Sequence, residues 1–506
     1  MKTVPCPRLI VLLAATLGLA CPARAQAPAP SPAKPAAPDT SAARALLTAY
    51  LKDPNTVEVT LVTLRLAADA DVVPLFVAYS SGSDRRLRLL ATTALAELKG
   101  DAAMAALWER VRTDTAMAIR AQCLAVLIQT KSITPEQLQE ALKIDDENVR
   151  YLAASGMVSA GLGAQVAPQL RKLVESRDVP TSALSRLCLL SLGQGDQLDP
   201  VTRIMSDPAT PPAVVEMMLN QIQEMKVAAA AGLAEALAAS TKDDSLRLQA
   251  FRAVAAISPD GARKVAVAIV KSDKTPFRVH LFRILIKHKD APAQLAALAQ
   301  GKDALAAMAR FQIARADAGP PAAQAAAELV AAAHPIVLGH LLEALKEDVS
   351  RLGEKADAYT PVLLDIVRKV PKQEGRLRSE QELAAWAAML VGDIGSPKAL
   401  EGLKELLAGP YGESKRAVVG GMLRSKNPAA VALVTPLLDS PYDELMATSA
   451  IALARQNDQA AAKTLADMLA HSHRYRTDVR LLAGWYSLRL AGEHKAFIAE
   501  AARSVR

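Results

Sequence analysis

The sequence predicts an all-α protein built from repeated helical pairs, and three observations support this fold class. Hydrophobic residues make up 51% of the chain but aromatic residues only 3%, and an apolar share of mainly Ala and Leu favours closely packed helices over sheets. A chain of 506 residues is too long for one compact core, which indicates several domains or a repeat array. A helical pattern also recurs at a step of about 31–32 residues.

The start of the chain has the composition of an export signal. Lys2 and Arg8 supply positive charge, and Leu9–Ala20 form an apolar stretch. This stretch is too short to span a bilayer as a helix, which takes about 20 residues. Ala23–Ala25 then place small residues at the positions that a signal peptidase reads. We therefore expect cleavage before Gln26 and a periplasmic or secreted mature protein.

A lipoprotein acylated on Cys21 is the alternative. Gly18 and the bulky Leu19 depart from the preferred bacterial lipobox, so the cleaved form is our prediction. Residues 26–40 consist almost entirely of Ala, Pro, Ser and Gln. Such a segment cannot bury apolar surface, and we expect it to be an extended tether.

The repeated pattern is an acidic residue, then an apolar-Arg pair, then small or apolar residues at helical spacing. Its clearest copies are Asp84 with Leu87-Arg88, Asp146 with Val149-Arg150, and Asp243 with Leu246-Arg247. We expect the Asp to cap the helix start and the apolar stripe to form the buried face. The Arg is placed to reach an acid or a helix C-terminus in the next repeat.

The step gives about 14 helical pairs. An introductory helix is expected over Ser41–Lys52, and first helices are expected to start near residues 55, 84, 115, 146, 180, 211, 244, 275, 302, 335, 380, 412, 442 and 475. Second helices are indicated where a capping residue precedes a proline: Thr134, Ser258, Ser396 and Asn427. Glycines between helices suit left-handed C-caps: Gly100, Gly161, Gly163, Gly193 and Gly195.

The spacing between repeats is longer in one segment of the chain. Residues 346–379 are charged and contain Pro371 and Gly375, which indicates either longer helices with a polar connector or an insertion that can hinge the array. The expected organisation is a signal peptide, a tether and two arrays around an irregular segment: 1–25, 26–40, 41–345, 346–379 and 380–506.

The repeated motif resembles the HEAT-like repeats of bacteria, including the short class seen in phycobilin lyases. The resemblance covers nearly the whole mature chain, although copies such as Met446-Ser449-Ala452-Leu453 lack the Asp or the Arg. It implies an ARM/HEAT-type α-solenoid that forms a right-handed superhelix. It also implies a groove lined by second helices, which such proteins typically use to bind other proteins.

Charge and cysteines narrow the functional classes. The net charge of +8 falls to +5 without the three positive residues of the export signal, and no Lys/Arg-rich run indicates a nucleic-acid surface. No later stretch is long and uncharged enough to span a bilayer. Cys123 and Cys188 stay in the mature chain about two repeats apart, too far for a disulfide, so we expect two buried thiols.

No motif predicts a catalytic, cofactor or metal site. The mature chain has no Cys-x-x-Cys, His-Glu-x-x-His or Gly-x-Ser-x-Gly. Gly193-Gln194-Gly195 has no preceding strand and is expected to stop a helix. Asp145-Asp146-Glu147 is expected to begin a helix, since no alternating calcium-ligand loop follows. His334 and His340 do not share a helical face.

The segment His471–Arg476 is the one candidate partner surface in the sequence. It contains a His-x-His, two arginines and Tyr475, and Trp485 and Tyr486 follow it. The alternative, which we prefer, is a solvated loop before a capping repeat. Trp108, Trp386 and Trp485 are each expected in the core or at its rim.

The sequence therefore predicts a non-enzymatic binding or scaffold protein of the bacterial cell envelope. It would engage a protein partner through the solenoid groove, without a cofactor. One alternative is an accessory or lyase-like protein that holds a small ligand in the groove, and another is a passive structural element of an envelope complex. No catalytic, cofactor-binding, metal-binding or partner-binding residue is assigned.

Overall fold

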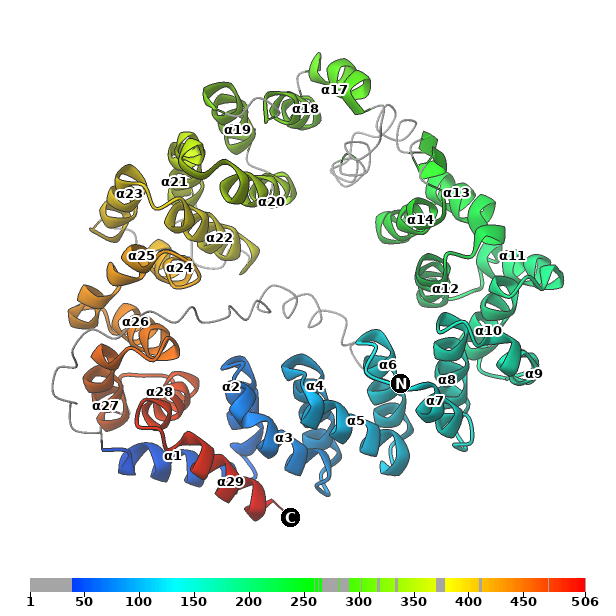
Figure 1. The fold of residues 1–506 in the computed structure, drawn as a ribbon, viewed down its shortest axis with the longest axis horizontal. Coiled ribbons are helices and arrows are strands. Elements are labelled where there is room, and N and C mark those ends of the chain that lie inside the picture. The colour runs from blue at the N-terminus through cyan, green and yellow to red at the C-terminus, as the bar shows by residue number, and fades with distance from the viewer. Residues whose placement is uncertain are drawn as a thin grey trace. The chain divides into compact units, whose positions relative to one another are not determined.

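The computed structural model describes residues 39–505 except 259, 263, 266–281, 283–290, 302, 316–318, 333–334, 370–377, 409–411 and 472. These residues form α-helices and short 3-10 helices and contain no β-strand (Figure 1), which confirms the all-α fold. The predictions of a signal peptide, of Cys21 lipidation, of most of the tether and of a repeat near residue 275 lie outside the described residues. The chain divides into two compact units: unit 1 is Met1–Leu127 with Leu465–Arg506, and unit 2 is Ile128–Thr464.

Helical pairs follow one another along both units. Unit 1 opens with α1 (Ser41–Lys52), which has the bounds of the expected introductory helix. It continues with α2 (Val57–Leu66), η2 (Ala70–Val72), α3 (Val73–Ser80), α4 (Arg85–Leu98), α5 (Asp101–Thr113) and α6 (Met117–Gln129), whose last two residues belong to unit 2. Its C-terminal part contains the end of α27 (Ala462–Ala470), then α28 (Thr477–Leu490) and α29 (His494–Ser504).

Unit 2 contains the remaining pairs. Its first helices are α8 (Glu147–Ser159), α10 (Val179–Ser191), α12 (Pro212–Met225), α14 (Asp244–Ile257), α18 (Ala304–Arg315), α20 (Pro335–Leu352), α22 (Arg378–Ile394), α24 (Gly412–Met422) and α26 (Asp443–Arg455). Its second helices are α7 (Pro135–Ala141), α9 (Gly163–Leu173), α11 (Leu198–Ser206), α13 (Ala231–Ser240), α17 (Ala291–Ala299), α19 (Pro320–Ala332), α21 (Thr360–Lys369), α23 (Pro397–Ala408) and α25 (Pro428–Ala432). Outside 263–290, every predicted first-helix start lies within two residues of an observed one.

The first helices pack against one another and form a layer of their own. In unit 2, α12 contacts α10 and α14, and α22 contacts α20 and α24. Second helices form the other layer, as Figure 1 shows for α11 and α13 beside α12 and α14. A Cβ on Gly421 of α24 would lie 2.3 Å from the carbonyl oxygen of Ala385 on α22, so only glycine allows this close approach. The predicted stacking of helical pairs is thus present.

The helix starts use the predicted caps. Asp84 accepts hydrogen bonds from the amides of Arg86 and Leu87 at 2.7 and 3.4 Å, and Asp146 and Asp243 do the same at α8 and α14. The residues before the helix-starting prolines cap second helices: Thr134, Ser396 and Asn427. The predicted left-handed glycines divide into two groups. Gly100, Gly161 and Gly193 have positive φ, but Gly163 begins α9 and Gly195 begins η3 (Gly195–Gln197) without it.

The repeated arginine makes the predicted contact with the next repeat at some positions and a contact with its own loop at others. Arg88, Arg120 and Arg150 each donate to a backbone carbonyl six residues earlier, in the loop that leads into their own helix. Arg88 also crosses to the next repeat, where its Nε lies 2.9 Å from the buried Asp114 carboxylate. Arg416 similarly lies 3.0 Å from Glu444. The arginine therefore ties down the loop before its own helix, and at Arg88 and Arg416 it also pairs with an acid of the next repeat as predicted.

The described part of the break over 346–379 lies inside unit 2 and is helical, whereas Pro371 and Gly375 lie outside the described residues. Helix α20 continues to Leu352, and η5 (Gly353–Tyr359) and α21 follow it directly. The fully buried Asp348 accepts hydrogen bonds from Arg315 Nε at 2.8 Å and from the Tyr359 hydroxyl at 3.2 Å. Burial and the nearby Asp348 charge raise the pKa of Tyr359. This network anchors the extra turns of α20 to its neighbours.

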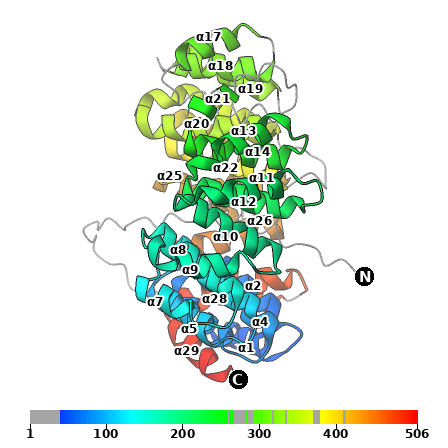
Figure 2. The same ribbon diagram turned by 90° about the vertical axis from the view of Figure 1, so that its right-hand side faces the viewer.

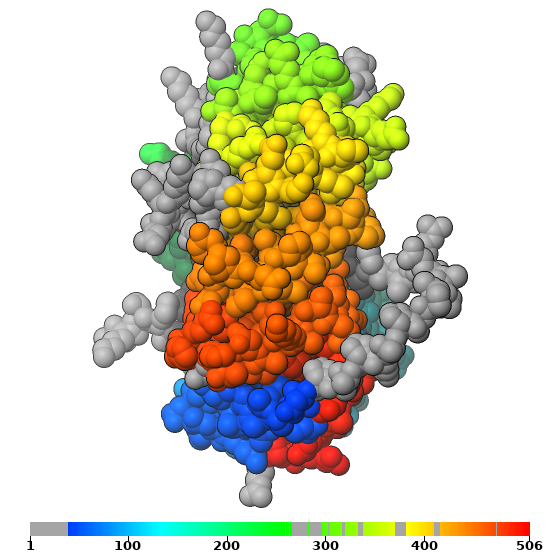
Figure 3. Space-filling model, turned by 90° about the vertical axis from the view of Figure 1, so that its left-hand side faces the viewer, coloured from blue at the N-terminus to red at the C-terminus, as the bar shows by residue number. Residues whose placement is uncertain are grey.

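The last helices of the chain pack against the first ones, within unit 1. Helix α28 contacts α1 and α2, and α29 contacts η2 and α3; Figure 2 shows α28 and α29 beside α1, and Figure 3 shows the blue and red ends in contact. We call this contact of α1–α3 with α28–α29 the seam. Phe497 of α29 is buried there beneath Arg44 of α1, and Trp485 and Tyr486 of α28 are also buried. The expected C-terminal array over 380–506 is therefore divided, because burying two apolar terminal faces against each other is favourable.

Candidate functional site

Exposed large apolar side chains occur on one class of helix. Within the described ranges, all eight lie on first helices or at the residue before one. In unit 1 they are Val59, Leu66, Leu89 and Met117, and in unit 2 they are Val179, Met217, Ile313 and Tyr442. Single exposed apolar residues are ordinary on any protein surface. Their restriction to one layer of the repeat is what makes this layer the candidate interaction surface.

The four exposed apolar residues of unit 1 lie on neighbouring helices that contact one another. Val59 and Leu66 are seven residues apart on α2, hence on one helical face, and α2 packs against α4. Thr93, one turn after Leu89 on α4, accepts a hydrogen bond from Gln122 of α6 at 3.1 Å. We call Val59, Leu66, Leu89 and Met117 the first-helix patch.

This location differs from the expectation attached to the resemblance, which placed the binding groove on second helices. The sequence reasoning also missed these residues. Leu89 follows the motif Arg88 directly and therefore lies off the buried stripe that contains Ala91 and Leu95. Apolar residues off the buried stripe of several successive first helices were the available signal.

The segment His471–Arg476 does not provide an exposed aromatic surface. Tyr475, Trp485 and Tyr486 are buried, so none of them is presented to a partner. His471 and the arginines are exposed and lie near acidic side chains. His471 Nδ1 lies 3.0 Å from Asp467, and Arg476 Nε lies 3.2 Å from Asp478. The solvated-loop alternative fits this arrangement.

The acidic run at α8 is used for capping and local pairing. Asp146 caps the helix, Asp145 lies 3.1 Å from Arg150, and Glu147 accepts a hydrogen bond from Ser176 at 2.5 Å. In the part of the chain that the structure describes, no three His, Cys, Asp or Glu side chains gather as metal ligands. His340 lies 3.6 Å from Glu343 of its own helix, and His334 lies outside the described residues.

Cys123 and Cys188 are buried free thiols, as expected. Burial raises the pKa of each to about 12, so neither is an activated nucleophile.

Cys188 belongs to a polar cluster between α8, α10 and α12. Gln221 accepts a hydrogen bond from the Tyr151 hydroxyl at 3.1 Å and donates to Ser155 at 3.1 Å. It also donates to Cys188 Sγ at 3.6 Å. Such a satisfied network fixes the packing of three helices.

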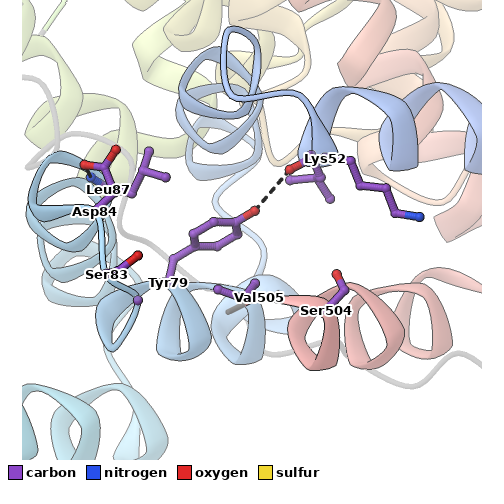
Figure 4. A pocket seen from close by; sticks show the side chains of 9 residues that line it. Lys52, Tyr79, Ser83, Asp84, Leu87, Ser504 and Val505 are labelled. Carbon is purple, nitrogen blue, oxygen red and sulfur yellow. Dashed lines mark hydrogen bonds between the residues drawn. The ribbon is translucent and has the colours of Figure 1, made fainter.

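A pocket of about 280 Å³ lies beside the seam (Figure 4). Its wall includes Tyr79, Asp84, Leu87 and Val505. Several of its polar groups already have intramolecular partners: the Tyr79 hydroxyl donates to the Leu51 carbonyl at 3.3 Å, and Asp84 caps α4. Burial raises the pKa of Tyr79. The pocket therefore resembles a packing gap more than a ligand site, where several polar groups converge on free space.

Among the described helices, none is long and apolar enough to cross a bilayer. Trp108 and Trp386 are half-buried and Trp485 is fully buried, which agrees with the expected core or rim packing.

Comparison with known proteins finds no matching family model and no matching curated sequence. Among solved structures, the chain is similar to human deoxyhypusine hydroxylase in complex with glycerol, with 13% identity and a TM-score of 0.21 over 77% of this chain and 96% of that one. It is also similar to UNC-45 from Drosophila melanogaster, with 12% identity and a TM-score of 0.28 over 84% and 70%. A third is karyopherin Kap121p bound to the SUMO protease Ulp1p, with 12% identity and a TM-score of 0.26 over 92% and 64%. At such scores the fold assignment rests on the observed helical pairs themselves.

Proposed function

We propose that this protein is an exported HEAT-like repeat protein that acts as a non-enzymatic scaffold of the bacterial cell envelope and binds a protein partner. The observation that supports it is that, among the residues the structure describes, the exposed large apolar side chains are restricted to the first-helix layer. The stacked-pair fold is of the kind that offers extended protein-binding surfaces.

The partner would contact the first-helix patch through apolar side chains. Leu66 and Met117 are the most exposed members, at 53% and 63%. Covering such side chains removes apolar area from water, which contributes about 25 cal/mol per Å². Met adapts to irregular partner surfaces, and its enrichment at interfaces fits this use.

Site-specific photo-crosslinking tests the proposal. A photoreactive amino acid placed at Leu66 of the mature protein should give a protein adduct in an envelope fraction, and the same residue at Ala105 should not. Ala105 is also exposed but lies on the second helix α5. The adduct should disappear when Val59, Leu89 and Met117 are changed to Ser. Equal adducts from both positions, or none from Leu66, would contradict the assignment of the patch.

Mass spectrometry of the mature protein tests the proposed export and the processing of its N-terminus. A chain that begins at Gln26 supports cleavage and release, whereas a diacylated chain that begins at Cys21 would establish the lipoprotein alternative. A full-length chain that retains Met1 would contradict export by this signal.

A further inference from the structure

The seam is a contact between two surfaces that come from opposite ends of the chain. At its apolar centre α28 lies close to α1, so that a Cβ on Gly484 would be 3.5 Å from Leu47 Cγ. Leu47 and Trp485 are fully buried, and Phe497 and Ile498 of α29 are nearly so. The α1–α3 side therefore presents an apolar acceptor face, and α28–α29 cover it.

Charges of opposite sign surround this centre in matched pairs. On the acceptor side, Asp69 lies 2.5 Å from Arg489 Nη1, and the Asp71 carboxylate is hydrogen-bonded to His494 Nε2 at 2.8 Å. Asp71 also lies 3.3 Å from Lys495. Complementary charges around an apolar centre select one partner and one orientation, because any other pairing brings like charges together.

A third pair has the opposite polarity. Arg44 of α1 lies 2.9 Å from Glu500 of α29 and 3.5 Å from Glu493, the residue before α29, and the Thr40 hydroxyl donates to Glu493 at 2.8 Å. The acceptor face thus carries one positive and two negative positions, and α28–α29 carry their complements. Trp485 packs edge-to-face on His494 with ring centroids 5.7 Å apart, which holds the histidine toward Asp71.

We propose that the α1–α3 face is a self-recognition surface for the α28–α29 helix pair. Within one chain it binds that pair in cis. When cis closure is blocked, it binds the same pair of a second copy of this chain. The two surfaces differ from each other, so the contact is heterologous, and the covalent link between them favours the cis form in the wild-type chain.

Charge exchange between two full-length variants tests the proposal. The acceptor variant is Asp69→Arg/Asp71→Arg, and the donor variant is Arg489→Asp/Lys495→Asp. Each variant alone faces like charges across its own seam and should remain monomeric with fast amide exchange in α28 and α29. In an equimolar mixture, introduced arginines face introduced aspartates in one seam, and native residues face each other in the second. Light scattering should then give twice the monomer mass, with a dimer fraction at least tenfold above that of either variant alone.

Controls separate recognition from general charge effects and from misfolding. A matched mixture of Glu58→Arg and Arg503→Glu chains, changed at exposed positions, should stay monomeric. A single chain with all four seam substitutions should regain a protected, monomeric seam. If either double variant loses its helical circular dichroism, the milder pair Asp71→Lys and Lys495→Glu replaces it.

Three results would overturn the proposal. The mixture could remain at monomer mass while α28 and α29 exchange freely, which would mean that the acceptor face does not bind the pair in trans. Each variant alone could retain a protected seam, which would mean that the charges do not specify it. Either variant alone could dimerise as much as the mixture, which would mean that the contact is not selective.

Discussion

Gly420 and Gly421 of α24 form a matched pair for testing how closely first helices approach. A Cβ on Gly421 would lie 2.3 Å from Ala385 O and 2.7 Å from both Ala388 Cβ and Met389 N of α22. A Cβ on Gly420 would meet nothing within 4 Å. The two substitutions to Ala therefore share their local effect and differ in packing.

The expected difference follows from two terms. Replacing a helical glycine by alanine stabilises a helix by about 0.5–1 kcal/mol, and this gain applies at both positions. Overpacking a close contact costs about 1–3 kcal/mol, and it applies at Gly421 alone. The nearest atom, Ala385 O, is backbone and cannot rotate away. We expect Gly420→Ala to stabilise the repeat and Gly421→Ala to be less stable than Gly420→Ala by about 1–3 kcal/mol.

Amide hydrogen exchange is the suitable measurement, because stacked repeats couple mainly to their neighbours and global unfolding need not be two-state. Faster exchange in α22 and α24 of the Gly421→Ala variant, with slower or unchanged exchange in Gly420→Ala, is the expected result. Equal protection in both variants would refute the close helix approach.

Three other substitutions or treatments have distinct expected outcomes. Asp114→Asn leaves the Arg88 guanidinium, which is 11% exposed, without its buried counter-charge. The free energy of unfolding, measured with denaturant, should fall by about 3 kcal/mol. A smaller loss than that of an exposed Arg86→Ala control would contradict this. Native Cys188 should react with a thiol reagent far more slowly than after unfolding, because burial raises its pKa to about 12; similar rates would be inconsistent with its burial. Burial raises the pKa of Asp71, but hydrogen bonds from His494 and Lys495 outweigh it and give a net lowered pKa. Asp71 therefore stabilises the fold above its unfolded pKa of about 3.9 and loses that effect as the pH falls through its lower folded value. Urea midpoints of wild type and Asp71→Asn should accordingly differ at pH 7 and converge in strong acid; a constant difference would contradict the pairing.

Local features were predictable because they depend on neighbours in sequence. The spacing of apolar residues located the described first helices to within two residues. Asp84, Asp146 and Asp243 were identified as caps because a capping side chain binds amides two or three residues ahead. The role of the motif arginine was only partly predicted. A helical position alone does not decide between a carbonyl six residues back, as for Arg150, and an acid in the next repeat, as for Arg88.

Non-local pairing explains what was missed at the candidate surface. Trp485 and Tyr486 follow a basic loop and resembled a partner surface in sequence, but both are buried. Leu66 and Met117 resembled ordinary helix residues, yet their side chains are 53% and 63% exposed. Whether an apolar side chain is core or surface depends on what packs over it, and that information is absent from local periodicity.

The sequence by itself determined the repeat: its step, its helix starts, its caps and its all-α class. Only the tertiary structure decided which surfaces meet and which stay open. Asp69 and Arg489 are 420 residues apart in the chain, and the repeat pattern of the sequence does not reveal their ion pair. The physical reason is that each helix pair can bury its apolar face on any suitable neighbour. For the terminal pairs, that neighbour is the opposite end of the same chain.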